Sequence, residues 1–157
     1  AKELIVCVAR IDTWKKNKNA IISATKKNGI SINYYKKIVP IVYTQGFFGI
    51  IGLFKKILIF IIGIFKTIPR EPTSISDMRV WAHKTTALAC QNLMLSLRAY
   101  GYDTCPMEGI DSKRIKKMLN LGNGAEINMV ISIGKRADNG VYGKRFRLNS
   151  DNFIKII

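Results

Sequence analysis

The chain has 157 residues, of which 48% are hydrophobic and 23% are charged. This composition fits one compact domain with a sizeable core and excludes wholesale disorder. The formal net charge of +16 comes from 26 basic and 10 acidic residues, and it would favour an anionic partner such as nucleic acid, an acidic membrane surface or a phosphorylated cofactor. The abundance of lysine, isoleucine and asparagine also fits the codons of an AT-rich genome, and we favour this interpretation.

Three cysteines and one histidine are the residues that could bind zinc or form a disulfide. Cys7, Cys90 and Cys105 are an odd number, are widely spaced and form no C-x-x-C pair. With a single histidine, we expect no metal site. The simplest interpretation is that the cysteines are buried free thiols in a reducing cytoplasm.

The N-terminal part predicts one strand followed by a polar surface. Residues 4–8, Leu-Ile-Val-Cys-Val, are too few for the core of a signal peptide and predict a buried strand. Because the chain opens on this strand without an initiator methionine, we expect upstream sequence to be missing. Residues 10–37 are rich in Lys, Asn and Ser and predict a solvated loop and helix surface. A nucleic-acid stripe is the alternative, but aromatic residues that could stack on bases are nearly absent before Tyr34.

Residues 46–68 are almost entirely apolar, with three lysines as interruptions. Lys55 and Lys56 would lie near the middle of a membrane span, and the segment lacks the polar face of an interfacial helix, so neither is favoured. We expect an apolar insertion or lid over residues 46–72, buried against its own domain or against a partner subunit. The prolines that follow residue 68 would end it.

The strongest helix pattern runs from Met78 to Tyr100. Residues 73–77 supply several capping candidates and an acid for the first turn, and Gly101 is the expected stop. Two apolar stripes run along the segment, so we expect a helix that is buried on most sides.

The C-terminal part predicts two strands around a short helix. The expected elements are an extended segment over 102–107, a helix over 110–121, a strand over 126–133, a loop over 134–143 and a short extended piece over 144–148. The helix would turn Ile115, Met118 and Leu119 toward the core. Together these patterns indicate an α+β fold, a mixed sheet flanked by helices, in a single partial domain over residues 1–157.

No standard catalytic motif occurs in the sequence, which has no P-loop, no G-x-G-x-x-G, no H-E-x-x-H and no G-x-S-x-G. His83 lies on the predicted long helix without an obvious acidic partner nearby in sequence. We interpret it as structural, with a catalytic role as the alternative. We therefore expect no catalytic side chain, and if the protein is an enzyme, a cofactor carries the reaction.

Two segments could hold a cofactor. In Cys105-Pro106-Met107-Glu108-Gly109 a strand end runs into a turn, where the glycine would let a flat ligand approach a backbone N–H closely. In Arg145-Phe146-Arg147 an extended backbone would put both guanidinium groups on one side, as a fork suited to a phosphate. On spacing alone, an ordinary turn and two solvated arginines remain the alternatives.

Residues 77–148 resemble the C-terminal half of nitroreductase-family flavoproteins. The resemblance is carried by WAHKTTALACQNLML from residue 81, GYDTCPMEG from residue 101, INMVISIG from residue 127 and RFR from residue 145. Their order and spacing fit the family, and P-M-E-G is a fairly specific part. Residues 40–72 also resemble an insertion of one subfamily.

This resemblance implies an FMN-dependent oxidoreductase that passes hydride from NAD(P)H through the flavin to a nitroaromatic, quinone or similar acceptor. It also implies a homodimer with FMN at the subunit interface, and the free cysteines favour a cytoplasmic location. The residues implied to bind FMN are Pro106, Met107, Glu108, Gly109, Arg145 and Arg147. Residues 106–109 would lie along the isoalloxazine ring, with the Gly109 amide near flavin N5 and Glu108 near the nicotinamide. The two arginines would hold the FMN phosphate.

Two motifs of the family have no counterpart in this chain: an N-terminal R-x-S-x-R phosphate motif and a later flavin-binding segment that contains an asparagine. We therefore expect either a fragment or a poor FMN binder. A degenerate, non-catalytic flavin- or ligand-binding protein is the second hypothesis. A basic binder of a membrane surface or of nucleic acid is the third; we expect no nucleic-acid partner, and membrane contact is not favoured.

Overall fold

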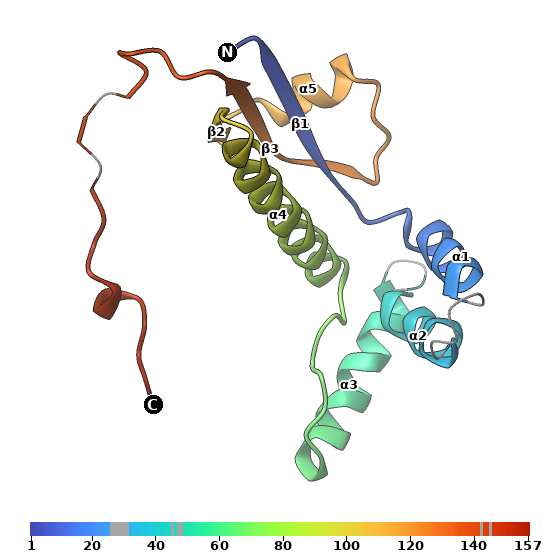
Figure 1. Cartoon of the computed structure of the whole chain (residues 1–157). Helices are drawn as coiled ribbons and strands as arrows, with labels where there is room; N and C mark the ends of the chain where they lie inside the picture. The colour runs from blue at the N-terminus through green and yellow to red at the C-terminus, as the bar shows by residue number, and fades with distance from the viewer. Residues whose placement is uncertain (26–31, 45, 47–48, 142, 145) are drawn as a thin grey trace.

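The computed structural model describes residues 1–25, 32–44, 46, 49–141, 143–144 and 146–157. Within these residues the elements are, in chain order, β1 (Glu3–Arg10), α1 (Trp14–Thr25), the π-helical turn η1 (Tyr34–Ile38), α2 (Val39–Tyr43), α3 (Ile50–Phe65), α4 (Ile75–Ala99), β2 (Asp103–Met107), α5 (Ser112–Met118), β3 (Ala125–Gly134) and the short η3 (Ser150–Asn152). Figure 1 shows one sheet flanked by helices, with α1, α2 and α3 at one end. The predicted α+β fold is confirmed.

The sheet formed by the described residues has β3 in the centre and β1 and β2 at its edges. Both edge strands pair with β3 antiparallel, with Val6 opposite Val130 and Pro106 opposite Ile131. The prediction of a mixed sheet is therefore not met within these three strands. The reason is their order: β1 and β2 run in the same direction, but β3 lies between them.

The core lies between this sheet and α4, which crosses one of its faces (Figure 1). Ile131, in the middle of β3, has no exposed surface, and burying such a side chain contributes about 1.5–3 kcal/mol. Residues of β3 two positions apart face the same way, so alternate residues reach α4. The buried cluster consists of Cys90, Met129, Ile131 and Ile133, with Ile5, Cys7, Leu93, Met94 and Leu97 packed around it.

A capping box starts α4. The hydroxyl of Ser74 accepts a hydrogen bond from the Asp77 amide at 3.0 Å, and the Asp77 carboxylate accepts one from the Ser74 amide at 2.9 Å. The Thr73 amide donates to the same carboxylate at 2.8 Å, and this bond is the largest cause that lowers the pKa of Asp77. After the helix, Gly101 has a φ of +80°, a left-handed conformation that glycine adopts readily. The predicted start and stop of the helix are both confirmed.

The prediction that α4 is buried on most sides is wrong for this chain. Only Met78 and Cys90 are buried along the helix, whereas the side chains of Val80, Leu88 and Leu95 are exposed. The sheet covers the face of α4 that carries Cys90 and Met94, and the face that carries Leu88 and Leu95 remains open to solvent.

The apolar segment forms α3, which extends away from the sheet (Figure 1). Burial against its own domain, one of the two expected arrangements, is not observed, because most of its large apolar side chains are exposed. Two side-chain hydrogen bonds tie α3 to other described residues: the Lys55 ammonium donates to the Val42 carbonyl at 3.0 Å, and Arg70 donates to the Gly63 carbonyl at 3.4 Å. Burial against a partner subunit stays a prediction. No helix of the described residues is long and apolar enough to cross a membrane.

The helix predicted over residues 110–121 is observed as the shorter α5, Ser112–Met118. Asp111 caps this helix: its carboxylate accepts a hydrogen bond from the Arg114 amide at 3.0 Å. Ile115 is half-buried, but Met118 and Leu119 are exposed. The prediction that they face the core is wrong, because only one side of this short helix meets the sheet.

Candidate functional site

Residues 106–109 form an exposed corner between β2 and α5. Pro106 and Met107 end the edge strand β2, where a proline is tolerated because no ladder hydrogen bond is lost on the outer side. Pro106, Glu108 and Gly109 are exposed, and Met107 is half-buried. These four predicted residues therefore lie together at the end of an edge strand, and three of them are exposed.

The backbone at Gly109 is open to a ligand. A Cβ atom built there meets no other atom within 4 Å. The next amide along, that of Ile110, donates to the Glu108 carbonyl at 2.8 Å, whereas the Gly109 amide has no acceptor among the described residues. An N–H without an acceptor, at an exposed glycine, can donate to an acceptor atom on the edge of a flat ring.

The predicted phosphate fork is not assembled in the described residues. Arg145 lies outside them. Arg147 is exposed, and its guanidinium donates to the neighbouring Phe146 carbonyl at 2.9 Å. The extended piece expected over residues 144–148 forms no strand among its described residues. In Figure 1 the C-terminal segment runs away from the sheet and from α5, so the structure does not bring Arg147 to residues 106–109.

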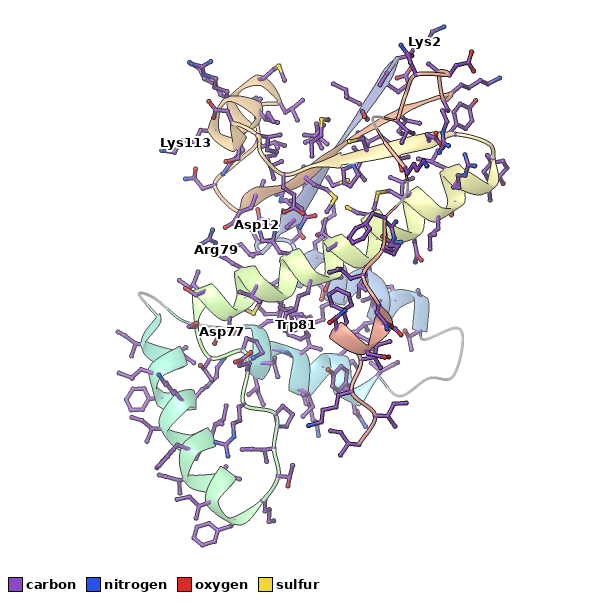
Figure 2. All side chains as sticks on the ribbon, turned by 90° about the vertical axis from the view of Figure 1, so that its left-hand side faces the viewer. Lys2, Asp12, Asp77, Arg79, Trp81 and Lys113 are labelled. Carbon is purple, nitrogen blue, oxygen red and sulfur yellow. The ribbon has the colours of Figure 1, made fainter. Side chains whose placement is uncertain are left out.

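A polar cluster that sequence analysis missed joins α4 to β3 around His83. Its Nε2 lies 3.0 Å from a carboxylate oxygen of Glu126, and the Asn128 amide nitrogen lies 2.9 Å from its Nδ1. Arg79, one turn earlier on α4, pairs with the other oxygen of Glu126 at 2.5 Å. In Figure 2 Arg79 points from α4 toward the sheet, and Trp81 points from the opposite side of the helix.

This cluster holds His83 in one tautomer. The Asn128 amide nitrogen also donates to the His83 carbonyl at 3.3 Å, which fixes that nitrogen as the group beside Nδ1. Nδ1 is then an acceptor, and Nε2 carries the proton that is donated to Glu126. The arrangement supports the interpretation of His83 as structural. Glu126 and Asn128 are two positions apart, the spacing of side chains on one side of a strand, and this spacing was the sequence signal. They reach α4 together with Met129, Ile131 and Ile133 because the register of β3 against β1 shifts between Ile127 and Met129.

The cysteines are not all buried as predicted. Cys90 is buried, Cys7 is half-buried and Cys105 is exposed, because Cys105 lies on an edge strand. The pKa of the Cys7 thiol is raised to about 11, mainly by burial and also by a hydrogen bond with Cys90. The thiol is therefore protonated and inert at neutral pH. Among the described residues, no group of three or more His, Cys, Asp and Glu side chains could hold a metal.

Comparison with known proteins gives the family. A family model described as the nitroreductase family matches residues 56–135, just over half of the chain. The protein DrgA of Synechocystis sp. is 39% identical over 75 residues, which are 48% of this chain and 35% of DrgA. MhqN of Bacillus subtilis, assigned as an NAD(P)H nitroreductase, is 32% identical over 74 residues, which are 47% of this chain and 36% of MhqN.

Solved structures agree on the fold. YdfN of Bacillus subtilis, assigned as a nitroreductase, superposes with a TM-score of 0.67 and 19% identity over 98% of this chain and 63% of its own. A protein of Exiguobacterium sibiricum, assigned as a nitroreductase and solved in complex with FMN, gives a TM-score of 0.64 and 21% identity over 98% of this chain and 61% of its own. The matched regions span about a third of the length of these two curated relatives. On its sequence and its fold, the chain belongs to the nitroreductase family.

Proposed function

We propose that this chain is the flavin-binding part of an NAD(P)H-dependent oxidoreductase that reduces a nitroaromatic, quinone or similar acceptor. The observation that supports this most directly is the open corner at residues 106–109, which lies inside the region matched by the family model. The relative solved with FMN and the assignment of MhqN as an NAD(P)H nitroreductase support the same cofactor and electron donor.

The residues at this corner fit the edge and face of a flavin ring. The Gly109 amide is available as a donor, and the space where a side chain would begin is empty. Half-buried Met107 would give the ring an apolar contact, and the exposed Glu108 carboxylate would lie on the side open to the nicotinamide. When bound, FMN supplies the hydride relay between NAD(P)H and the acceptor. The protein side chains then need to bind, orient and exclude water, without acting as acid or base.

The phosphate of FMN would need a cationic partner, and Arg145 and Arg147 are the residues we propose. Because the C-terminal segment runs away from the corner within one chain (Figure 1), we place these arginines beside the flavin of a second copy. The apolar faces that α3 and α4 leave exposed would form the contact between the two copies. The working unit is thus a homodimer, and we propose that it is cytoplasmic.

The test is the visible absorption spectrum of the full chain after incubation with FMN and removal of free ligand. We expect flavin absorbance that travels with the protein, bleaches when NADH or NADPH is added without oxygen, and returns when a quinone is added. A chain that retains no FMN would contradict the proposal and favour the degenerate ligand-binding protein. Retention of FMN without bleaching would contradict the oxidoreductase assignment alone.

A further inference from the structure

A cavity of about 630 Å³ lies beside the N-terminal half of α4, and none of residues 106–109 lines it. Residues of α1, η1, α2 and the first turns of α4 line it, together with the end of β1 and the turn that follows it, and it is open to solvent on one side. In Figure 1 α1 and α2 lie beyond the lower end of β1, whereas α5, which begins three residues after Gly109, lies beside the sheet at the top. The volume lies within the range of about 300–1,000 Å³ that is usual for small-molecule sites.

Aromatic rings form the main wall of this cavity. The ring of Tyr43 lies between those of Trp14 and Trp81, at centroid distances of 5.7 Å and 4.8 Å. The rings are tilted by about 40° to each other, so they offer both faces and edges to a planar guest. Tyr35 also lines the cavity and is half-buried. Burial is the main cause that raises the pKa of Tyr43, so its phenol is a neutral hydrogen-bond donor at physiological pH.

The charge lining the cavity is positive. Lys18 and Arg10 line it, and no Asp or Glu is among its described lining residues. The guanidinium of Arg10 is already paired with Asp12: its Nε and Nη2 donate to the two carboxylate oxygens at 2.8 Å and 2.7 Å. Half-buried Lys18 has no carboxylate within ion-pair distance among the described residues, so its ammonium is available to an anion.

We infer that this cavity is a binding site for a planar aromatic anion, such as an aromatic carboxylate. Trp14, Tyr43 and Trp81 would contact its ring, and Lys18 would pair with its anionic group. Stacking on these rings and a charge-assisted contact are the interactions that the wall offers. The site uses none of residues 106–109 and goes beyond the proposed flavin chemistry.

The chain carries its own reporter, because Trp14 and Trp81 are its two tryptophans and both line the cavity. The experiment titrates the full chain, without flavin, with naphthoate and with its neutral analogue naphthamide. Binding is followed by calorimetry and by tryptophan emission. We expect saturable binding of naphthoate, with a change of emission in both Trp14→Phe and Trp81→Phe, each of which retains one tryptophan.

The variant Lys18→Gln should raise the Kd of naphthoate about tenfold, which is the size expected for a charge-assisted contact, and should change the Kd of naphthamide less than twofold. Lys16→Gln is the matched control, since Lys16 is exposed on the same helix and does not line the cavity. Circular dichroism checks that each variant keeps its helices.

Absence of saturable naphthoate binding would overturn the inference, and so would equal losses in Lys18→Gln and Lys16→Gln. Unchanged emission in both single-tryptophan variants would place any bound naphthoate elsewhere and would also overturn it. Because no flavin is present, each of these results leaves the proposed oxidoreductase function untouched.

Discussion

Nε2 of His83 lies 3.0 Å from the carboxylate of Glu126, across 43 positions of sequence. Glu126 also accepts a hydrogen bond from Arg79, so one carboxylate fastens two successive turns of α4 to β3. The hydrogen bond from Arg79 is the largest cause that lowers the pKa of Glu126, and His83 lowers it further.

This pair predicts a pH dependence of stability. Because the pKa of Glu126 is lower in the folded chain than in the unfolded one, its contribution to stability is complete above the ordinary pKa of a glutamate and is lost as the pH falls through the lowered folded value. Glu126→Gln should therefore lower the free energy of unfolding at neutral pH. On acidification, the free energy of unfolding of this variant should fall less than that of the wild type. Urea unfolding at neutral and acid pH measures this. Glu3→Gln, on the exposed start of β1, is the control, and equal pH profiles for both variants would contradict the prediction.

The capping box of α4 predicts a local stability effect. Ser74→Ala removes the acceptor of the Asp77 amide and should lower the free energy of unfolding by about 0.5–2 kcal/mol. Ser76→Ala is a matched control, because Ser76 is exposed in the first turn and makes no capping bond among the described residues. Chemical unfolding followed by circular dichroism gives both values. A loss of the same size in the two variants would exclude a specific cap.

The open surface at Gly109 predicts a binding defect without a folding defect. In Gly109→Val the new methyl groups would occupy space that the proposed flavin needs, while the Cβ atom meets nothing in the chain within 4 Å. FMN retention should fall at least tenfold with an unchanged unfolding midpoint. Gly122→Val is the control, because a Cβ there also meets nothing within 4 Å. A Gly109→Val protein that retains FMN as the wild type does would remove this residue from the site.

The proposed phosphate contacts predict a ligand-dependent loss. Replacing both Arg145 and Arg147 with Ala should weaken FMN by tenfold or more per contact, because charge-assisted hydrogen bonds contribute about 1.5–3 kcal/mol each. Riboflavin, which lacks the phosphate, should lose little. Fluorescence titration with both flavins measures the two affinities. Equal losses would refute the phosphate assignment.

The exposed face of α4 predicts self-association. Leu88 is 71% and Leu95 59% exposed on this helix, and a twofold contact would bury both side chains in both copies. Leu88→Lys should convert a dimer into a monomer in light scattering and reduce FMN retention as well. Met118→Lys is the control, since Met118 is 75% exposed on α5. A wild-type monomer that retains one FMN per chain would contradict the prediction.

Local signals were strong enough to predict β1, α4, β2 and β3, because each depends on an apolar period or a cap within a few residues. The Ser74 and Asp77 cap is an example. The exposure of α3 and of one face of α4 was not predictable, since periodicity says which residues are apolar and not what covers them. The partners of His83 were missed for a related reason: a contact between a helix and a strand depends on how they pack.

The same difference between local and long-range signals applies to the candidate site. Residues 106–109 are contiguous, so one strand end and one turn place them together. The arginine pair depends on the path of a long C-terminal segment, which no local pattern specifies. The aromatic cavity gave no sequence signal at all, because Trp14, Tyr43 and Trp81 come from three separate helices.

β1 is an edge strand of eight residues, and its outer row of N–H and C=O groups has no partner strand among the described residues. Such an edge can template the addition of a strand from another molecule, and proteins often protect it with charge. Here Lys2, Glu3 and Arg10 lie at its two ends, around an apolar run. Repulsion between chains of net charge +16 adds protection at low ionic strength, but its range shrinks to about 10 Å at 0.1 M salt. Added salt should therefore promote aggregation of this protein through pairing of β1 edges between molecules.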